Sequence, residues 1–248
     1  MELVVLGAGP AYTNRLGAAG AAYLVQHSAQ GAIVLDLGQG VFPRLAGELD
    51  PADLLAVVVS HLHPDHFIDL VPLRHYLYYE CRPPRRVTVH APAALETRLD
   101  ALMGEPGFAG ASLDIRALAA GSRSIGPFAV EASLVTHTDE SYGFRVASRG
   151  GSGLVYSGDC GRADDLVGLI RPGDTLLCEV SFGPGPVPAV ALHLDAPAVA
   201  RLASQSRAGR VLLTHLQMGF DPGETERVVR AGFDGDVQFV WPGDRLTV

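Results

Sequence analysis

Short runs of apolar residues recur along the chain and are bounded by turn-forming residues. Leu54–Val59 holds five β-branched or leucyl residues and predicts a buried strand. Leu3–Leu6 predicts a strand near the N-terminus. Ala21–Gln26 and Ala32–Leu37 predict two more, joined by a turn into a meander. The first quarter of the chain is therefore expected to form a sheet.

The second half repeats one arrangement, in which an apolar strand ends at a polar side chain. The four pairs are Ala129–Thr136 with His137, Gly153–Ser157 with Asp159, Asp174–Cys178 with Glu179, and Val211–Thr214 with His215. In α/β sheets, loops at the carboxyl ends of strands are where sites assemble. Polar residues at the ends of four successive strands are hard to attribute to solubility alone, so these residues are candidates for one common site.

Three segments between the strands have the spacing of helices, which makes the chain α/β. Phe67–Glu80 is apolar at helical intervals, and Pro72 inside it predicts a kink or a late start. Pro92–Gly104 predicts a helix ended by glycine. Ala196–Ser204 predicts a helix with Asp195 as its N-cap.

Composition narrows the class of protein. The 248 residues, 48% apolar and 19% charged, suffice for one domain spanning 1–248. A net charge of −8 provides no basic field for nucleic acid. Cys81, Cys160 and Cys178 lie far apart, which favours a reducing compartment over a disulfide framework. Without a basic leader or an apolar run near 18 residues, we expect a cytoplasmic protein outside the membrane.

The strongest chemical signal is the sequence His61-Leu62-His63-Pro64-Asp65-His66, directly after the Leu54–Val59 strand. In extended backbone, His61 and His63 point the same way. Pro64 ends the strand, and a turn there can bring Asp65 and His66 to the same point. Imidazole with carboxylate suits zinc, manganese or iron and favours hydrolysis over a closed structural site.

Other polar segments are less specific. Gly7-Ala8-Gly9-Pro10 lacks the third glycine of a dinucleotide fingerprint and predicts a tight turn instead. Asp36, at the end of a strand, is expected either to orient a metal-binding histidine or to cap the next turn. The basic segment Cys81–Arg86 is interpreted as a solvated loop rather than a phosphate clamp. The shapes of the loops around Ala11–Arg15, Tyr76–Arg86 and Phe182–Leu192 are expected to decide the substrate.

The complete ordered set of motifs resembles the metallo-β-lactamase fold hydrolases, over almost the whole chain. This resemblance implies an αββα four-layer sandwich with two divalent metal ions, Zn²⁺ or Mn²⁺, at one edge. By the family pattern, one ion takes His61, His63 and His137, the other takes Asp65, His66 and His215, and Asp159 bridges them. The pattern further implies hydrolysis by a metal-bridging hydroxide, which Asp65 orients.

The closer resemblance is to the ribonuclease Z-like phosphodiesterases. Cys178-Glu179-Val180-Ser181-Phe182 is similar to their H-E-A-T-F segment, and His193 to the histidine of their H-S-T motif. The resemblance implies that Glu179 orients His193, which then stabilises the transition state or protonates the leaving oxygen. Only 21 residues separate His137 from Asp159, which leaves no room for the transfer-RNA-binding arm of ribonuclease Z.

These observations favour a dinuclear phosphodiesterase acting on a small phosphodiester, such as a cyclic nucleotide. Transfer-RNA 3′ endonuclease activity is disfavoured by the missing arm and the negative charge. A carboxyl-ester, lactone or thioester hydrolase on the same metals remains an alternative, as does a non-hydrolytic member that retains the metals. A homodimer is implied by the family resemblance alone.

Overall fold

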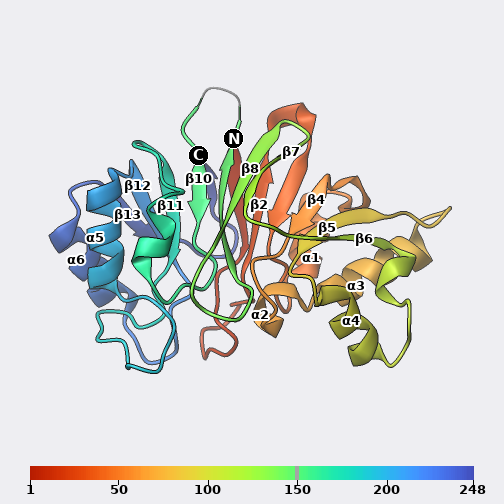
Figure 1. Cartoon of the computed structure of the whole chain (residues 1–248), viewed down its shortest axis with the longest axis horizontal. Coiled ribbons are helices and arrows are strands. Elements are labelled where there is room, and N and C mark those ends of the chain that lie inside the picture. The colour runs from red at the N-terminus through yellow and green to blue at the C-terminus, as the bar shows by residue number, and fades with distance from the viewer. Residues whose placement is uncertain (149–150) are drawn as a thin grey trace.

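The computed structural model describes residues 1–148 and 151–248. Within these residues, two seven-stranded sheets lie face to face between two layers of helices (Figure 1). The first sheet has the order β14-β1-β2-β3-β4-β5-β6 and the second β13-β12-β11-β10-β9-β8-β7. The predicted αββα sandwich is confirmed.

The strand bounds follow the predicted apolar runs closely. In the first sheet the strands are β1 (Glu2–Gly7), β2 (Ala22–Gln26), β3 (Ala32–Leu35), β4 (Ala56–Val58), β5 (Val87–Ala91), β6 (Leu113–Ala117) and β14 (Arg245–Thr247). In the second they are β7 (Gly121–Ile125), β8 (Phe128–Leu134), β9 (Tyr142–Ala147), β10 (Leu154–Tyr156), β11 (Thr175–Glu179), β12 (Arg210–Thr214) and β13 (Asp236–Phe239). β9 and β10 lie between His137 and Asp159, so much of that segment belongs to the sheet.

Alternation within the strands explains why they are apolar on both faces. In β1, Leu3 and Val5 join the core between the sheets, whereas Val4 and Leu6 join the core under the helices. In β12, Leu212 faces the other sheet and its neighbours face the outer helices. Successive side chains point to opposite faces, and both faces of each sheet are covered. The result is three apolar layers.

The outer helices cover the two sheets separately (Figure 1). The first sheet carries α1 (Phe42–Glu48), α2 (Pro64–Phe67), α3 (Leu70–His75), a π-helical turn (Tyr76–Glu80) and α4 (Leu95–Met103), and the second carries α5 (Ala196–Ser206) and α6 (Pro222–Gly232). The late start predicted for the Phe67–Glu80 helix is observed, since α3 begins at Leu70 with Pro72 in its first turn. Asp195 caps α5 by accepting from Ala198 N at 3.0 Å, as predicted. No helix of the described residues is long and apolar enough to cross a membrane.

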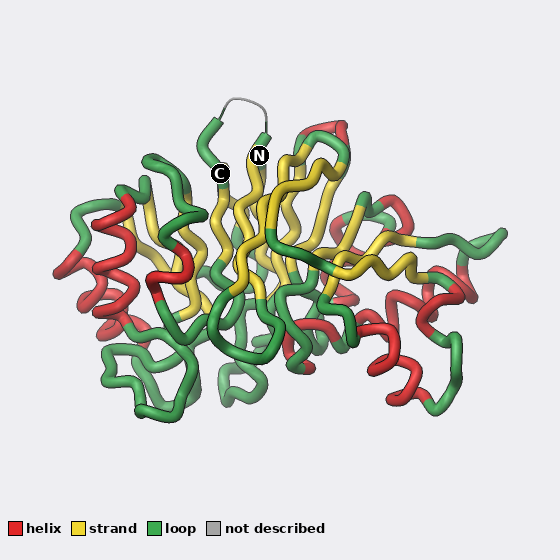
Figure 2. The backbone as a smooth tube through the Cα atoms, in the orientation of Figure 1, coloured by secondary structure: helices red, strands yellow, loops and turns green. Residues whose placement is uncertain are grey.

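Strand direction brings the polar strand ends to one edge. β10, β11 and β12 are parallel, and β8 runs in the same direction because two antiparallel pairings relate it to β10. In the first sheet, two antiparallel pairings through β2 give β1 and β3 the same direction, and β4 pairs with β3 in parallel. Figure 2 shows loops gathered along this edge, the lower one in the view. The site is built there.

Candidate metal centre

The segment after β4 folds as its sequence predicts. His61 Nε2 and His63 Nδ1 lie 3.0 Å apart, because the extended backbone directs both side chains to one side. Pro64 then begins α2 with its fixed φ at the first helical position. This turn buries Asp65 and His66 beside the strand end, whereas His63 stays exposed. Four polar side chains from six residues thus meet at one place.

A neighbouring turn depends on two glycines to reach this segment. Gly38 packs so closely on the helix α2 backbone that a Cβ there would lie 1.9 Å from Asp65 O. The adjacent backbone is bonded to the same turn, with Leu37 N donating to His66 O at 2.7 Å. Gly40 takes a positive φ of 76° that completes the turn. The segment Gly38–Gly40 therefore positions Asp65 and His66 through their main chain.

The first group of ligand-type atoms comprises His61, His63, His137 and Asp159. His137 Nε2 lies 3.1 Å from His63 Nδ1. Asp159 Oδ2 lies 3.8 Å from His61 Nε2 and 3.6 Å from His137 Nε2. All four ligand atoms fall within 4.8 Å of one another, a separation that one metal ion can span.

The second group comprises Asp65, His66 and His215. His215 Nε2 lies 3.2 Å from His66 Nε2 and 3.3 Å from Asp65 Oδ2. Asp159 Oδ1 faces this group, at 3.4 Å from both His66 Nε2 and His215 Nε2. Asp159 therefore directs one carboxylate oxygen to each group, which is the arrangement required of a bridging ligand.

The outer ring nitrogens of four histidines are anchored by hydrogen bonds. The contacts are His61 Nδ1 to Ser60 Oγ at 3.1 Å, His66 Nδ1 to Asp36 Oδ2 at 2.7 Å, His137 Nδ1 to Leu192 O at 2.8 Å, and His215 Nδ1 to Ser181 Oγ at 3.1 Å. A carbonyl or carboxylate only accepts, so His137 and His66 carry a proton on Nδ1. Ser60 Oγ gives its proton to Asp36, so it accepts from His61. The Nε2 atoms of these three histidines then face the centre, as metal binding requires.

Asp36 resolves the alternative that the sequence left open. It lies buried at a positive φ of 58°, and its carboxylate accepts from His66 Nδ1 rather than only capping a turn. Ser60 Oγ and Tyr156 OH also donate to the same Oδ2 atom, each at 2.7 Å. Tyr156 and Ser60 were not foreseen, because a tyrosine within an apolar strand and a serine after one carry no local signal of such a role.

The electrostatics of the cluster favour a bound cation. Burial, with neighbouring histidines, lowers the pKa of His61, His63 and His137, so these imidazoles are neutral at pH 7. Burial also acts to lower the pKa of His66, but the carboxylates of Asp159 and Asp36 outweigh it and hold that pKa well above its ordinary value. Asp36 accepts a hydrogen bond from His66 Nδ1, so Nε2 of His66 is the atom at which a metal can replace a proton.

Asp159 supplies a direct test of whether a metal fits. Its Oδ1 atom is buried and has no hydrogen-bond partner among the described residues. Burial acts to raise its pKa, but His215 and His66 hold that pKa well below its usual range, so the group is ionised. A buried, ionised oxygen without a donor is costly unless it binds a cation. With nitrogen and oxygen ligands around it, the site fits the binding of divalent metal.

Glu179 and His193 lie together beside the two groups. Glu179 Oε1 accepts from His193 Nδ1 and from Cys160 N, both at 3.0 Å, and Oε2 accepts from Ser181 N at 3.0 Å. His193 Nδ1 lies 3.9 Å from Asp159 Oδ2. Burial acts to lower the pKa of His193, but Glu179 and Asp159 raise it to about 9. His193 Nε2 has no hydrogen bond within the described ranges, so it is available to a ligand.

The structure thus brings together all nine residues predicted for the site, from both sheets. The basic loop lies apart from them: its Arg85 pairs with Asp53 at 3.0 Å, and both side chains are exposed. That observation agrees with a solvated loop. Ser181 was missed by the sequence analysis as a contact of His215, although its place two residues after Glu179 at a strand end was a usable signal.

Comparison with known proteins identifies the family and several relatives of this chain. The family described as "Beta-lactamase superfamily domain" matches residues 34–216. The chain is 33% identical to the protein ML1173 of Mycobacterium leprae over 232 residues, 91% of this chain and 81% of that protein. It is 25% identical to the probable metallo-hydrolase YhfI of Bacillus subtilis over 229 residues, 89% and 91% of the two chains.

Solved structures share the fold over the full length. The crystal structure of YhfI superposes with a TM-score of 0.87 at 23% identity, covering 99% of this chain and 98% of that one. The short form of human tRNase Z superposes with a TM-score of 0.74 at 19% identity, covering 100% and 99%. The predicted resemblance is confirmed, with ribonuclease Z-like proteins among the structural relatives. From this family match, which spans residues 34–216, the chain belongs to the β-lactamase superfamily.

Proposed function

We propose that this protein is a dinuclear metal-dependent phosphodiesterase that cleaves a small phosphodiester. His61, His63 and His137 would hold one metal ion, and Asp65, His66 and His215 would hold the other, with the carboxylate of Asp159 available to both groups. The list of ligands follows the two groups of converging side chains. Two divalent ions, Zn²⁺ or Mn²⁺, supply a Lewis acid for a phosphoryl oxygen and lower the pKa of an attacking water.

The pair of Glu179 and His193 is the observation that carries the phosphodiesterase proposal. A buried carboxylate fixes the ring of His193, and the free Nε2 lies on the side away from Glu179. Against the effect of burial, Glu179 and Asp159 raise the pKa of this imidazole to about 9, which favours its protonated form at neutral pH. A cationic N–H donor beside the metals suits the charge that develops on phosphoryl oxygens, or the proton that a leaving oxygen needs. Carboxyl-ester hydrolysis on two metals has no need of this pair.

Asp65 is proposed to have a second task besides binding a metal. Its Oδ2 atom lies 3.3 Å from His215 Nε2 and 3.6 Å from His66 Nε2, among the ligand atoms of the second group. His215 and His66 hold the pKa of this carboxyl below its ordinary value against the effect of burial, so it is ionised at pH 7. An ionised carboxylate there can accept a proton from an attacking water and orient it.

The surroundings of His193 match a small substrate. A cavity of about 430 Å³ opens beside it, lined in part by Arg162, Ala191 and Arg201. This volume is within the range of about 300–1,000 Å³ for small-molecule sites. The likeness to human tRNase Z supports phosphodiester chemistry, whereas the net charge of −8 and the missing arm disfavour a transfer-RNA substrate.

The test is hydrolysis of an activated aryl phosphodiester with defined Zn²⁺ or Mn²⁺ by the wild type, His193→Gln and His90→Gln. We expect His193→Gln to lose about 10²-fold or more of kcat, because a general acid contributes that much. His90 lies half-exposed on β5, outside the cluster, so its variant serves as the matched control. Metal content is measured in all three proteins.

Three outcomes would reject the phosphodiesterase proposal. The first is an unchanged rate in His193→Gln with both metals bound. The second is hydrolysis of an aryl acetate, but not of the phosphodiester, which would favour a carboxyl-ester hydrolase. The third is full metallation without turnover of either ester, which would favour a non-hydrolytic role.

A further inference from the structure

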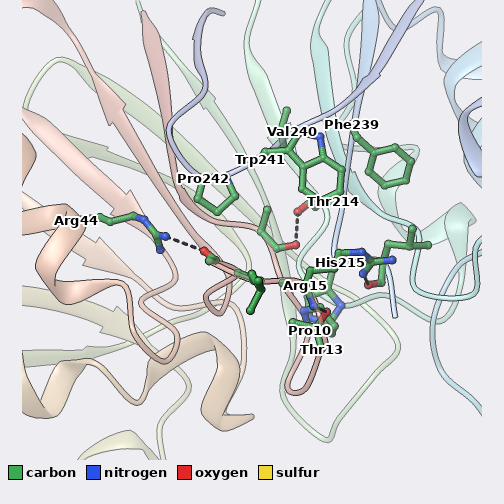
Figure 3. Close-up of a pocket in the computed structure, with 16 residues that line it drawn as sticks. Pro10, Thr13, Arg15, Arg44, Thr214, His215, Phe239, Val240, Trp241 and Pro242 are labelled. Atoms are coloured by element: carbon green, nitrogen blue, oxygen red, sulfur yellow. Dashed lines mark hydrogen bonds between the residues drawn. The ribbon is translucent and has the colours of Figure 1, made fainter. Parts of the chain in front are cut away.

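A second cavity of about 410 Å³ shares His215 with the metal cluster (Figure 3). Its walls come from four separate segments: the loop after β1, Arg44 of α1, the end of β12 with the residues that follow it, and residues 239–242 at the end of β13. His215 is tied to the first wall, because its backbone N–H donates to Ala8 O at 3.0 Å. Thr214 Oγ1 donates to the same carbonyl at 3.3 Å. A ligand in this pocket therefore lies next to the proposed metal site.

Two arginines place positive charge on the walls of the pocket. Arg15 donates to Leu216 O at 2.8 Å and Phe220 O at 3.0 Å. Arg44 donates to Gly17 O at 2.7 Å and, at 3.4 Å, to Leu6 O. Carbonyl oxygens fix the two guanidinium groups without neutralising them.

The composition of the walls strengthens this point. None of the described residues that line the pocket is an aspartate or a glutamate. Across residues 1–148 and 151–248, no carboxylate oxygen lies within 4.0 Å of the guanidinium group of Arg15 or Arg44. This is unusual in a chain with 27 acidic residues and a net charge of −8. Each guanidinium still has unused N–H donors, in the fork geometry that suits phosphate or carboxylate.

An aromatic wall completes the pocket. Trp241 is 42% exposed, and one of its faces is stacked on Phe239 with ring centroids 5.9 Å apart and planes at 28°. The backbone N–H of Trp241 donates to Asp244 Oδ2 at 2.8 Å, which holds the residue in place. In the view of Figure 3, Trp241 and Pro242 lie above the pocket, with Arg44 on one side and Arg15 and His215 on the other. An exposed indole in such a place is a platform for a planar ring.

We propose that this pocket binds the non-reacting part of the substrate, with a planar ring against Trp241 and an anionic group at the arginines that line it. The substrate class is then a phosphodiester that carries a ring and a second anionic group besides the scissile phosphate. The proposal rests on the proposed function in one respect, that the scissile group sits at the metals beside His215. Arg15 and Arg44 act as specificity-determining residues and take no part in bond cleavage.

Trp241 is the sole tryptophan of the chain, so its fluorescence reports directly on the pocket. Metal-free protein is titrated with adenosine 5′-monophosphate, adenosine and ribose 5-phosphate. We expect the monophosphate to change Trp241 emission and to bind about tenfold more tightly than either part alone, because it uses both the ring platform and the arginines. Its affinity should fall as salt is added, whereas that of adenosine should not.

Three arginine variants locate the anion. Arg44→Gln is expected to weaken monophosphate binding about tenfold and to leave adenosine binding unchanged. Arg44→Lys keeps the charge and should lie between that variant and the wild type. Arg227→Gln changes the charge equally on the exposed face of α6, away from the pocket, and should bind like the wild type. Unchanged adenosine binding in Arg44→Gln shows that the pocket is still formed.

The results separate this proposal from the proposed function. No change of Trp241 emission at millimolar monophosphate, or equal affinities for the monophosphate and adenosine, would overturn the pocket assignment and leave phosphodiester hydrolysis untouched. An equal loss of affinity in Arg44→Gln and Arg227→Gln would also overturn it, because the anion would then be held by the general field. Intact binding without any phosphodiester hydrolysis would reject the proposed function and leave the pocket as a binding site.

Discussion

Replacing Asp36 by asparagine tests how the protein holds one metal site. The Oδ2 atom of Asp36 accepts from His66 Nδ1, Ser60 Oγ and Tyr156 OH, each at 2.7 Å, and Oδ1 accepts from Ser60 N at 2.6 Å. All four donors point at a carboxylate that is fully buried. Asp36→Asn keeps the shape of the side chain and removes its charge and one acceptor.

The size of the effect follows from these contacts. If the amide oxygen takes the place of Oδ2, the amide nitrogen faces Ser60 N–H, and two donors oppose each other. The reverse orientation leaves three donors unpaired, so the first is preferred and costs about 1–3 kcal/mol of unfolding free energy. His66 then keeps its Nδ1 hydrogen bond but loses a charged acceptor. Loss of such a partner lowers metal affinity about 10–100-fold, or about 1.4–2.7 kcal/mol.

The assay is a competition titration of metal-free protein with Zn²⁺ against a coloured chelator, with chemical unfolding measured in parallel. We expect one of two Zn²⁺ equivalents to weaken in Asp36→Asn and the other to change little. Asp69→Asn is the matched control: Asp69 is also buried, but its Oδ2 accepts from Val41 N and Phe42 N instead of a histidine. Wild-type affinity for both equivalents in Asp36→Asn would refute the reasoning, and so would an equal loss in Asp69→Asn.

Two further predictions concern stability and assembly of the site. Asp174→Asn should cost about 3 kcal/mol at pH 7, because Asp174 is buried and accepts two hydrogen bonds from Arg145 at 2.7 and 2.9 Å. Burial acts to raise the pKa of Asp174, but Arg145 and backbone N–H groups lower it, so this stabilisation is present above the ordinary value of about 3.9 and is lost as pH falls below it. The free energies of unfolding of the two proteins, measured in urea, should therefore converge in acid. A difference that does not change with pH would contradict the assignment. Gly38→Ala should abolish binding of at least one metal, since its Cβ would lie 1.9 Å from Asp65 O, whereas Gly47→Ala, where nothing lies within 4 Å, should bind metal like the wild type.

Local rules were enough to predict the His61–His66 segment. Period-two alternation aligned His61 with His63, and the fixed φ of Pro64 began the turn that carries Asp65 and His66. The partners from the second sheet could not be derived in this way. His215 lies 149 positions from His66, and only the packing of the two sheets brings their Nε2 atoms to 3.2 Å. The order of motifs along the chain, compared with a known family, supplied that information.

Asp36 shows where a sequence leaves two roles open. Its position after an apolar strand suits a cap and a metal-site partner equally well. The choice is made by the parallel pairing of β3 with β4, which sets Leu35 opposite Val58 and lets Asp36 N donate to Val58 O at 2.9 Å. The carboxylate then lies beside the segment that follows β4. Strand register is a tertiary property, so no window of sequence around Asp36 contains it.

The helical segment Phe67–Glu80 shows a limit of another kind. Its apolar spacing predicted helix, and Pro72 predicted a late start, both of which agree with α3. The change to a π-helical turn at Tyr76 was not predicted. Apolar residues spaced for an α-helix also fit one widened turn, so periodicity does not distinguish them. The packing of Arg74 between Tyr78 and Phe108, at 4.5 and 4.2 Å from their ring centroids, accompanies that turn.

The charges around the site have a consequence for the substrate. In the proposed metal site, Asp65 and Asp159 are the anionic ligands among histidines, so two bound divalent ions would offset both carboxylates and attract a phosphoryl group. Elsewhere the chain is acidic, and the arginines beside His215 form a second positive region. A substrate with one anionic group gains from only one of these regions. On the proposed assignment, a substrate with two anionic groups would gain from both regions, and in an otherwise negative field that difference would favour its selection.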